Sequence, residues 1–219
     1  GRSRIKVEFD VGFDMETDCG SWSPFYNGVL KGTPLLLNIL NKYDIKATFF
    51  LTGEMAELFP EVGKNILNNN HDIGCHSLYH ETVGDPIFEI PGNKPLLKEE
   101  VFNRLALATK IIYKNIGVMP KTFRSPRLWG STEVVNSLEK LGYLADASYP
   151  LYFYGKQLEP YHPSEDNWLE IGSMNILEIP NFADITIKTK DKYGRDRDQW
   201  PTYRTKSSAL ISRAILTTY

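Results

Sequence analysis

Short apolar runs alternate with amphipathic stretches along most of this chain, and this alternation is what most limits its fold. In residues 5–11, apolar and charged side chains alternate with a period of two, which predicts a half-buried strand. Residues 45–51 are rich in β-branched and aromatic side chains, which favour a buried strand. Further strands are predicted at residues 72–77, 121–125, 143–148 and 176–179.

Helices are predicted between these strands. Thr33 followed by Pro34 is typical of a helix start, and Ser131 is a suitable N-cap. Gly142 is suited to ending the helix that Ser131 begins. The predicted helices cover residues 33–40, 54–70 with a break near Pro60, 97–112, 131–142 and 207–216.

A strand-then-helix rhythm of this kind builds a parallel sheet, either open or closed into a barrel. Six strands are predicted and none follows the last helix. A closed eight-stranded barrel usually takes about 250 residues. We therefore expect an α/β fold, with one domain over residues 1–219 and a C-terminal end that looks incomplete.

Composition excludes several classes of partner. The 219 residues carry a net charge of −2 with acidic and basic residues interleaved, so we expect no nucleic-acid partner. No apolar run has the length of a membrane span, so we expect no membrane partner. The first residues show no signal-peptide core, which slightly favours the cytoplasm. Two cysteines form no disulfide framework, and Cys75 is predicted to be a buried apolar side chain.

Acidic residues are concentrated just after the first predicted strand. Asp10, Asp14, Glu16 and Asp18 fall within nine residues. In parallel α/β barrels the active site lies at the C-terminal ends of the strands. A solvated acidic turn is the simpler interpretation, but the apolar residues between the carboxylates favour a partly buried position at the mouth of the barrel, where the strands end.

Two histidines follow the third predicted strand. His76 and His80 have the i, i+4 spacing that places two imidazoles on one side of a helical turn. Neutral imidazole is a common ligand of zinc and related metals. Two histidines with one carboxylate leave open positions for water and substrate, as in catalytic zinc sites. We therefore predict a divalent metal site, with zinc as first choice and cobalt, nickel and manganese as alternatives.

Polar residues also close the fourth and fifth predicted strands. Arg124 is expected to enter the same mouth and pair with a carboxylate, although a structural salt bridge is equally compatible. Asp146 ends the fifth strand. Trp129 is interpreted mainly as a core residue and only secondarily as a platform for a sugar ring. The long loop at residues 81–95 is a candidate functional loop.

The order of these segments resembles the polysaccharide deacetylase family (carbohydrate esterase family four). The resemblance covers residues 5–180 and includes the acidic strand end, the Arg-Ser-Pro sequence from Arg124 and the aspartate at 146. Its most specific part is the run Asn-His-Asp-Ile-Gly-Cys-His-Ser-Leu-Tyr-His-Glu at residues 70–81, with Asn70 in place of the family's glycine. The start of the chain looks most like the branch with peptidoglycan deacetylases and allantoinase-like hydrolases.

The resemblance implies a distorted (β/α) barrel of about seven parallel strands and hydrolysis of an N-acetyl group, or another amide, by metal-activated water. It implies that His76 and His80 are metal ligands. One alignment makes Asp10 the base and Asp14 the carboxylate ligand, while a rival makes Asp14 the base and Glu16 the ligand. Arg124 would orient the base, and Asp146 would support the general acid.

The family also supplies a histidine near its last strand as general acid, and no histidine follows His162 here. The expected function is deacetylation of N-acetylated sugars in a polysaccharide or peptidoglycan. Alternatives are hydrolysis of a small cyclic amide or imide, and a catalytically inactive homologue that binds carbohydrate. The expected partner is thus a carbohydrate or a small amide, and the sequence leaves a homo-oligomer open.

Overall fold

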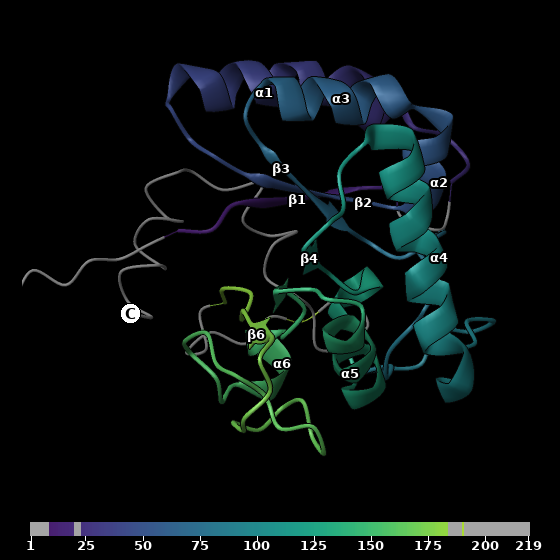
Figure 1. Cartoon of the computed structure of the whole chain (residues 1–219), viewed down its shortest axis with the longest axis vertical. Helices are drawn as coiled ribbons and strands as arrows, with labels where there is room; N and C mark the ends of the chain where they lie inside the picture. The colour runs from purple at the N-terminus through teal and green to yellow at the C-terminus, as the bar shows by residue number, and fades with distance from the viewer. Residues whose placement is uncertain (1–8, 20–22, 184–189, 191–219) are drawn as a thin grey trace, which may run out of the picture.

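The computed structural model describes residues 9–19, 23–183 and 190. Six parallel strands form one sheet in chain order (Figure 1). They are β1 (Gly12–Met15), β2 (Thr48–Leu51), β3 (Asp72–Cys75), β4 (Thr122–Phe123), β5 (Ala145–Asp146) and β6 (Leu177–Glu178). Because each strand pairs with the next along the chain, every crossover advances in the same direction, as it does in a barrel. This confirms the predicted α/β class.

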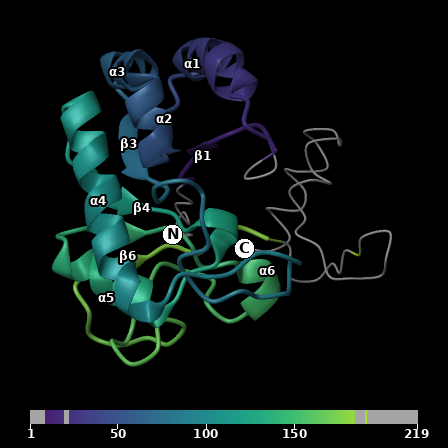
Figure 2. The ribbon, with the colours of Figure 1, turned by 90° about the vertical axis from the view of Figure 1, so that its right-hand side faces the viewer.

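The helices that connect the strands are π-helical η2 (Gly28–Gly32), α1 (Thr33–Lys42), α2 (Gly53–Leu58), α3 (Pro60–Asn68), α4 (Lys98–Ile116), 3-10 helix η3 (Pro126–Leu128), α5 (Thr132–Lys140) and α6 (Leu151–Tyr154). Helices α1 to α5 begin within one residue of predicted positions or at the predicted break near Pro60, whereas η2, η3 and α6 were not predicted. The Ser131 hydroxyl accepts a hydrogen bond from the backbone of Val134 as the N-cap of α5. In Figures 1 and 2, α1, α3 and α4 lie along one side of β1–β3. None of the helices within the described ranges is long and apolar enough to cross a membrane.

Apolar side chains from strands and helices meet in one core. Phe49, Leu51 and Phe123 of the strands have no exposed surface, and neither have Leu105 and Ile112 of α4. Cys75 is also fully buried among these side chains, as predicted. The burial of so many large apolar groups on the helix side of the sheet holds the strand ends in fixed positions.

The predicted position of the first strand is wrong. Residues 9–11 precede β1, and the Phe9 side chain is 63% exposed. The strand starts seven residues later and ends four residues later than predicted because Phe13 and Met15 pair with Phe49 and Leu51 of β2. The rest of the predicted strand, and the predicted helix at 207–216, lie outside the described residues.

The register of the sheet aligns the carboxyl ends of all six strands. One continuous row of paired residues contains Met15, Leu51, Cys75, Phe123, Asp146 and Glu178. Glu16, His76 and Arg124 each come directly after a residue of this row. The sheet therefore brings these three side chains to the same edge.

Candidate active site

Glu16, His76 and His80 converge at the carboxyl edge of β1 and β3. The Glu16 Oε2 atom lies 2.9 Å from His76 Nε2 and 2.8 Å from His80 Nε2. Both imidazoles are buried, and their ring centroids are 5.1 Å apart. The three ligand atoms all lie within 4.8 Å of one another, a spacing that one cation can bridge.

The donor atoms of this cluster fit a metal ion. Within the described residues, Glu16 Oε2 and His76 Nε2 are buried atoms that no conventional hydrogen bond satisfies. Buried polar groups of this kind are costly, and the two atoms lie 2.9 Å apart beside His80 Nε2, where one cation would satisfy them. Two imidazoles and one carboxylate are the ligand set of a catalytic zinc site and leave positions for water and substrate.

The orientation of His76 is set by the strand beside it. Its Nδ1 atom lies 2.6 Å from the backbone carbonyl oxygen of Arg124. A carbonyl oxygen can only accept, so Nδ1 carries the proton and Nε2 keeps its lone pair for a ligand. Such a second hydrogen bond is the usual way in which a metal-binding histidine is oriented.

His80 reaches the cluster through a tight turn, and the predicted helical turn is wrong. Ser77 and His80 have φ values of 61° and 60°, which interrupt any helix between the two histidines. The Glu81 carboxylate stabilises this turn by accepting from the Ser77 hydroxyl and, at 2.6 Å, from the backbone N–H of Tyr79. Glu81 was not singled out from the sequence, although a carboxylate directly after the second histidine was visible there.

The start of α2 holds the same turn from the other side. The backbone N–H groups of Gly53 and Glu54 donate to the carbonyl oxygens of Ser77 and Leu78, at 2.9 and 3.0 Å. Thr52 caps this helix by accepting from the backbone N–H of Met55. The position of His80 thus depends on the first turn of α2 as well as on β3.

Asp14 and Arg124 form an ion pair next to the cluster. Arg124 Nη1 donates to Asp14 Oδ1 at 3.0 Å, and Arg124 Nε donates to the Ala147 carbonyl oxygen at 3.1 Å. The guanidinium lies 4.4 Å from the centre of the Phe50 ring. Asp14 Oδ2 lies 3.8 Å from His76 Nε2. Arg124 therefore pairs with a carboxylate of the mouth, as the sequence predicts.

Charges within the cluster reinforce one another. Burial alone would raise the pKa of Glu16, but the adjacent imidazoles of His76 and His80 outweigh it and lower this pKa to about 2. Burial would lower the pKa of His76, while the carboxylates of Asp14 and Glu16 raise it above its ordinary value. The Glu16 side chain is thus held as a carboxylate, the form that binds cations.

Asp10 does not reach this site. It is exposed and lines a hollow with Lys46, Thr48 and Asp72 at the opposite, amino-terminal edge of the strands. The reason is that β1 starts two residues after Asp10, so the strand carries Asp14 and Glu16 to the carboxyl edge instead. The structure therefore offers no geometric basis for Asp10 as the catalytic base.

Asp146 lies at the carboxyl edge, where it pairs with Glu178 of the neighbouring strand. It is fully buried, accepts from the Ser148 hydroxyl at 2.6 Å and faces Glu178. Burial raises the pKa of Asp146 to about 6, although contacts with Glu178 and Ser148 oppose this effect. Glu178 was not predicted from the sequence because a single glutamate in a short strand gives no distinct signal.

The loop at residues 81–95 packs over the end of β4. The backbone N–H of Asp85 donates to Gly130, and the Phe88 ring meets Trp129 edge-on with centroids 5.1 Å apart. Trp129 is only 1% exposed, which confirms the interpretation as a core residue. Arg127, also missed from the sequence, places Nη1 3.5 Å from the His80 carbonyl oxygen.

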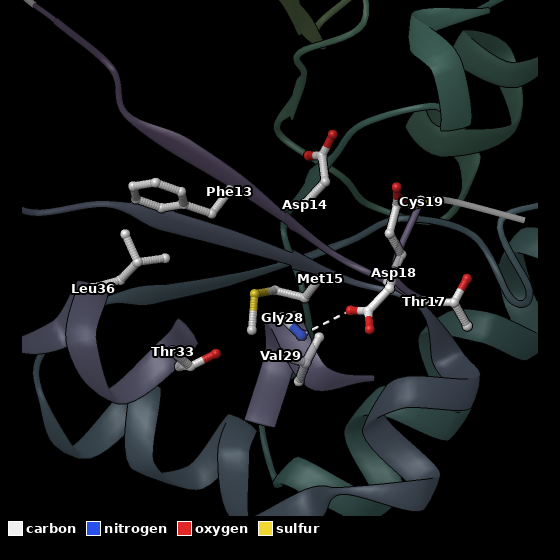
Figure 3. Close-up of a pocket in the computed structure, with 11 residues that line it drawn as sticks. Phe13, Asp14, Met15, Thr17, Asp18, Cys19, Gly28, Val29, Thr33 and Leu36 are labelled. Atoms are coloured by element: carbon white, nitrogen blue, oxygen red, sulfur yellow. Dashed lines mark hydrogen bonds between the residues drawn. The ribbon is translucent and has the colours of Figure 1, made fainter. Parts of the chain in front are cut away.

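A cavity of about 400 Å³ extends from the carboxylates of Asp14 and Glu16 along β1 (Figure 3). It is lined by Phe13, Asp14, Met15, Glu16, Thr17, Asp18, Cys19, Gly28, Val29, Thr33 and Leu36. In Figure 3 the Asp14 carboxylate points away from Phe13 and Met15. Asp18 closes the loop beside the cavity by accepting from the Gly28 backbone N–H at 2.7 Å.

Comparisons with known proteins point to one family. Residues 18–145 match the family model for polysaccharide deacetylase. A peptidoglycan-N-acetylglucosamine deacetylase of Bacillus cereus is 34% identical over 133 residues, which cover 50% of this chain and 45% of that protein. Chitin deacetylase 1 of Cryptococcus neoformans var. grubii is 32% identical over 110 residues, which cover 50% of this chain and 21% of that protein.

The chain thus spans less than half the length of these two curated relatives. A crystal structure assigned to a polysaccharide deacetylase from Mycobacterium smegmatis superimposes with a TM-score of 0.61 at 22% identity. The match covers 79% of this chain and 58% of that one. At this identity the likeness shows a shared fold, which agrees with the parallel strand order.

Proposed function

The chain belongs to the polysaccharide deacetylase family, and from this membership we propose that it is a divalent-metal-dependent deacetylase of N-acetylated sugars. The observation that carries the proposal is the convergence of Glu16, His76 and His80 beside the Asp14–Arg124 pair. This arrangement contains a site for a metal cation, the Asp14 carboxylate outside that site, and the Arg124 guanidinium that orients Asp14. Those are the parts that hydrolysis of an amide requires.

Glu16, His76 and His80 would hold the cation. A bound divalent ion would supply Lewis acidity and a lower pKa for water. We assign Glu16 as the carboxylate ligand because its Oε2 atom is within 2.9 Å of both imidazoles, whereas Asp14 Oδ2 is 3.8 Å from the nearer one. Zinc is the first choice for this ligand set, with cobalt, nickel and manganese as alternatives.

Asp14 is assigned as the general base in place of Asp10. Arg124 binds its Oδ1 atom and leaves Oδ2 on the side of the metal ligands. From there the carboxylate can take a proton from the attacking water. Stacking on Phe50 and the hydrogen bond to the Ala147 carbonyl keep Arg124 in one orientation, so the base is held in place before substrate arrives.

The substrate class follows from the relatives. The two relatives described above are named as a deacetylase of peptidoglycan N-acetylglucosamine and a deacetylase of chitin, which favours a polymer of N-acetylated sugars here. Their names do not favour the cyclic amide alternative. The proposal is therefore removal of acetyl groups from peptidoglycan or a related polysaccharide.

The direct test measures acetate release by the zinc- or cobalt-loaded protein from chitooligosaccharide and from peptidoglycan. A small cyclic imide serves as the competing substrate, followed by its ring opening. We expect acetate from at least one sugar polymer and loss of that activity in Asp14→Asn, which keeps the metal ligands. Sugar binding without acetate release by the metal-loaded protein would refute the proposal and support the inactive carbohydrate-binding alternative.

A further inference from the structure

Asp146 and Glu178 form a pair of carboxyl groups inside the protein. They occupy paired positions on β5 and β6, and neither has any exposed surface. Among the residues that the structure describes, none forms a hydrogen bond with Asp146 Oδ2 or Glu178 Oε2, and both atoms are buried. Two orphaned acceptor oxygens on facing side chains are unfavourable unless something joins them.

The other two carboxyl oxygens are fully used. Asp146 Oδ1 accepts from the Ser148 hydroxyl at 2.6 Å. Glu178 Oε1 accepts from the backbone N–H groups of Ser148 and Tyr149, at 3.2 and 3.0 Å. Only the orphaned oxygens are therefore left to interact across the pair.

No cation neutralises the two carboxyls within the part of the chain that the structure describes. The charged or titratable groups that face them are Arg124, Tyr149 and Tyr161. Arg124 donates hydrogen bonds to Asp14 and to the Ala147 carbonyl. The Tyr161 hydroxyl donates to the Trp168 carbonyl, and the Tyr149 hydroxyl accepts from the backbone of residues 156 and 157.

We propose that Asp146 and Glu178 share one proton at neutral pH and that Glu178, through this pair, is a positioning residue for Arg124. Two carboxylates side by side in an apolar interior cannot both stay ionised. One proton converts the two orphaned oxygens into a charge-assisted O–H···O hydrogen bond. In agreement with this, burial raises the pKa of Asp146 to about 6 and that of Glu178 well above its ordinary value.

The pair is linked to the catalytic edge by a short chain of contacts. Glu178 fixes the backbone of Ser148, whose hydroxyl in turn accepts from the backbone N–H of Ser125 at 2.8 Å. The preceding carbonyl, that of Ala147, is the one that accepts from Arg124 Nε. Both Arg124 and the residue after it are thus held by the segment that Glu178 anchors. This step rests on the proposed role of Arg124 in orienting Asp14.

Glu178→Gln tests the shared proton. Its carboxamide oxygen can keep the acceptor role toward Ser148 and Tyr149, while its NH₂ can donate to Asp146. In the wild type, the pair takes up a proton when the protein folds. The folding constant should therefore fall by about tenfold per pH unit as pH rises above about 4, the ordinary pKa of a carboxyl group. Glu178→Gln needs no such proton and should lack this slope.

The measurement is the melting temperature between about pH 5 and about pH 8, a window that includes the raised pKa of Asp146. We expect the difference between Glu178→Gln and wild type to increase steadily with pH. Glu170→Gln, which removes an exposed carboxylate paired with Lys156, is the matched control and should run parallel to wild type. Infrared absorption of a protonated carboxyl at neutral pH should disappear in Glu178→Gln. Parallel melting curves and no such absorption would overturn the shared proton.

Glu178→Ala tests the positioning role. Removing the acceptor for Ser148 and Tyr149 should lower kcat by up to about a hundredfold with metal content unchanged, and Glu178→Gln should restore most of it. Unchanged kcat in a folded, metal-loaded Glu178→Ala protein would overturn the positioning role. If the wild type itself releases no acetate, the proposed function fails, while melting and infrared measurements still decide whether the proton is shared.

Discussion

Carboxylates end the strands at both sides of this sheet, but their neighbours differ. At β1, Glu16 faces the imidazoles of His76 and His80, and its pKa is lowered to about 2 in spite of burial. At β5, Asp146 faces another carboxyl, that of Glu178, and burial raises its pKa to about 6. A carboxyl group at the strand ends is therefore held as an anion beside β1, whereas burial favours protonation of the Asp146–Glu178 pair at β5 and β6.

The difference shows that the partner of a strand-end carboxylate decides its role. An imidazole partner stabilises the charge and converges on a cation site, whereas a carboxyl partner favours a neutral, structural pair. The two sides also differ in exposure to solvent. The Asp14 side chain is 35% exposed beside the metal ligands, while Asp146 has no exposed surface. Among the described residues, the carboxylate beside β1 is therefore the more accessible of the two.

Removing an imidazole from the β1 side should have the largest effect. His76→Ala or His80→Ala leaves Glu16 with one neutral ligand neighbour, so we expect loss of the bound metal. Acetate release should fall by about a thousandfold or more, since a Lewis acid supplies several kcal/mol of transition-state stabilisation. Metal analysis and acetate release measure both effects. His162→Ala, which alters an exposed histidine, is the control, and retention of metal by the cluster variants would contradict the site.

The next largest effect separates the two carboxylates of β1. Asp14→Asn should keep the metal and lower kcat by about 10²–10⁴, the usual contribution of a general base. Glu16→Gln should instead weaken metal binding, because a neutral amide replaces a charged ligand. Metal titration of both folded variants decides between them. The reverse result, with metal lost only in Asp14→Asn, would restore Asp14 as the ligand.

The sequence alone does not decide whether Asp14 or Glu16 is the carboxylate ligand of the metal. Apolar side chains alternate with Asp10, Asp14 and Glu16 without interruption from residue 9 to residue 16. A period of two therefore identifies an extended segment but does not say which part of it pairs. Pairing with β2 decides this, and moving the end of the strand by four residues changes which carboxylate stands beside His76.

Sequence signals for helix ends predicted the structure better than the pattern that was used to place the first strand. The helix start at Thr33 and Pro34, the break at Pro60 and the Ser131 cap were predicted correctly because each depends on neighbours within a few residues, although Gly32 and not Thr33 is the N-cap of α1. The spacing of His76 and His80 predicted their proximity, but through a helix that does not form. The pairing of Asp146 with Glu178 joins residues 32 positions apart on two short strands, and no local sequence pattern predicts it.

A smaller effect should follow from crowding Arg124. A Cβ atom at residue 12 would lie 2.8 Å from Arg124 Nη2 and 2.9 Å from the Phe50 ring, so Gly12→Ala must displace the guanidinium or the ring. We expect kcat to fall about tenfold while metal content stays unchanged, because only the orientation of Asp14 suffers. Gly32→Ala, where a Cβ meets nothing within 4 Å, is the matched control. Equal kcat for both variants would show that Arg124 does not position the base.

The smallest effect compares two helix caps of the same kind. The hydroxyls of Thr52 and Ser131 each accept one backbone N–H at a helix start, so either alanine variant should lose about 1 kcal/mol of unfolding free energy, measured in urea. Only Thr52 caps the helix whose first N–H groups hold the turn that carries His80. Metal titration should therefore show weaker binding in Thr52→Ala and unchanged binding in Ser131→Ala. If the two variants bind metal equally, the first turn of α2 stabilises the fold without setting the position of His80.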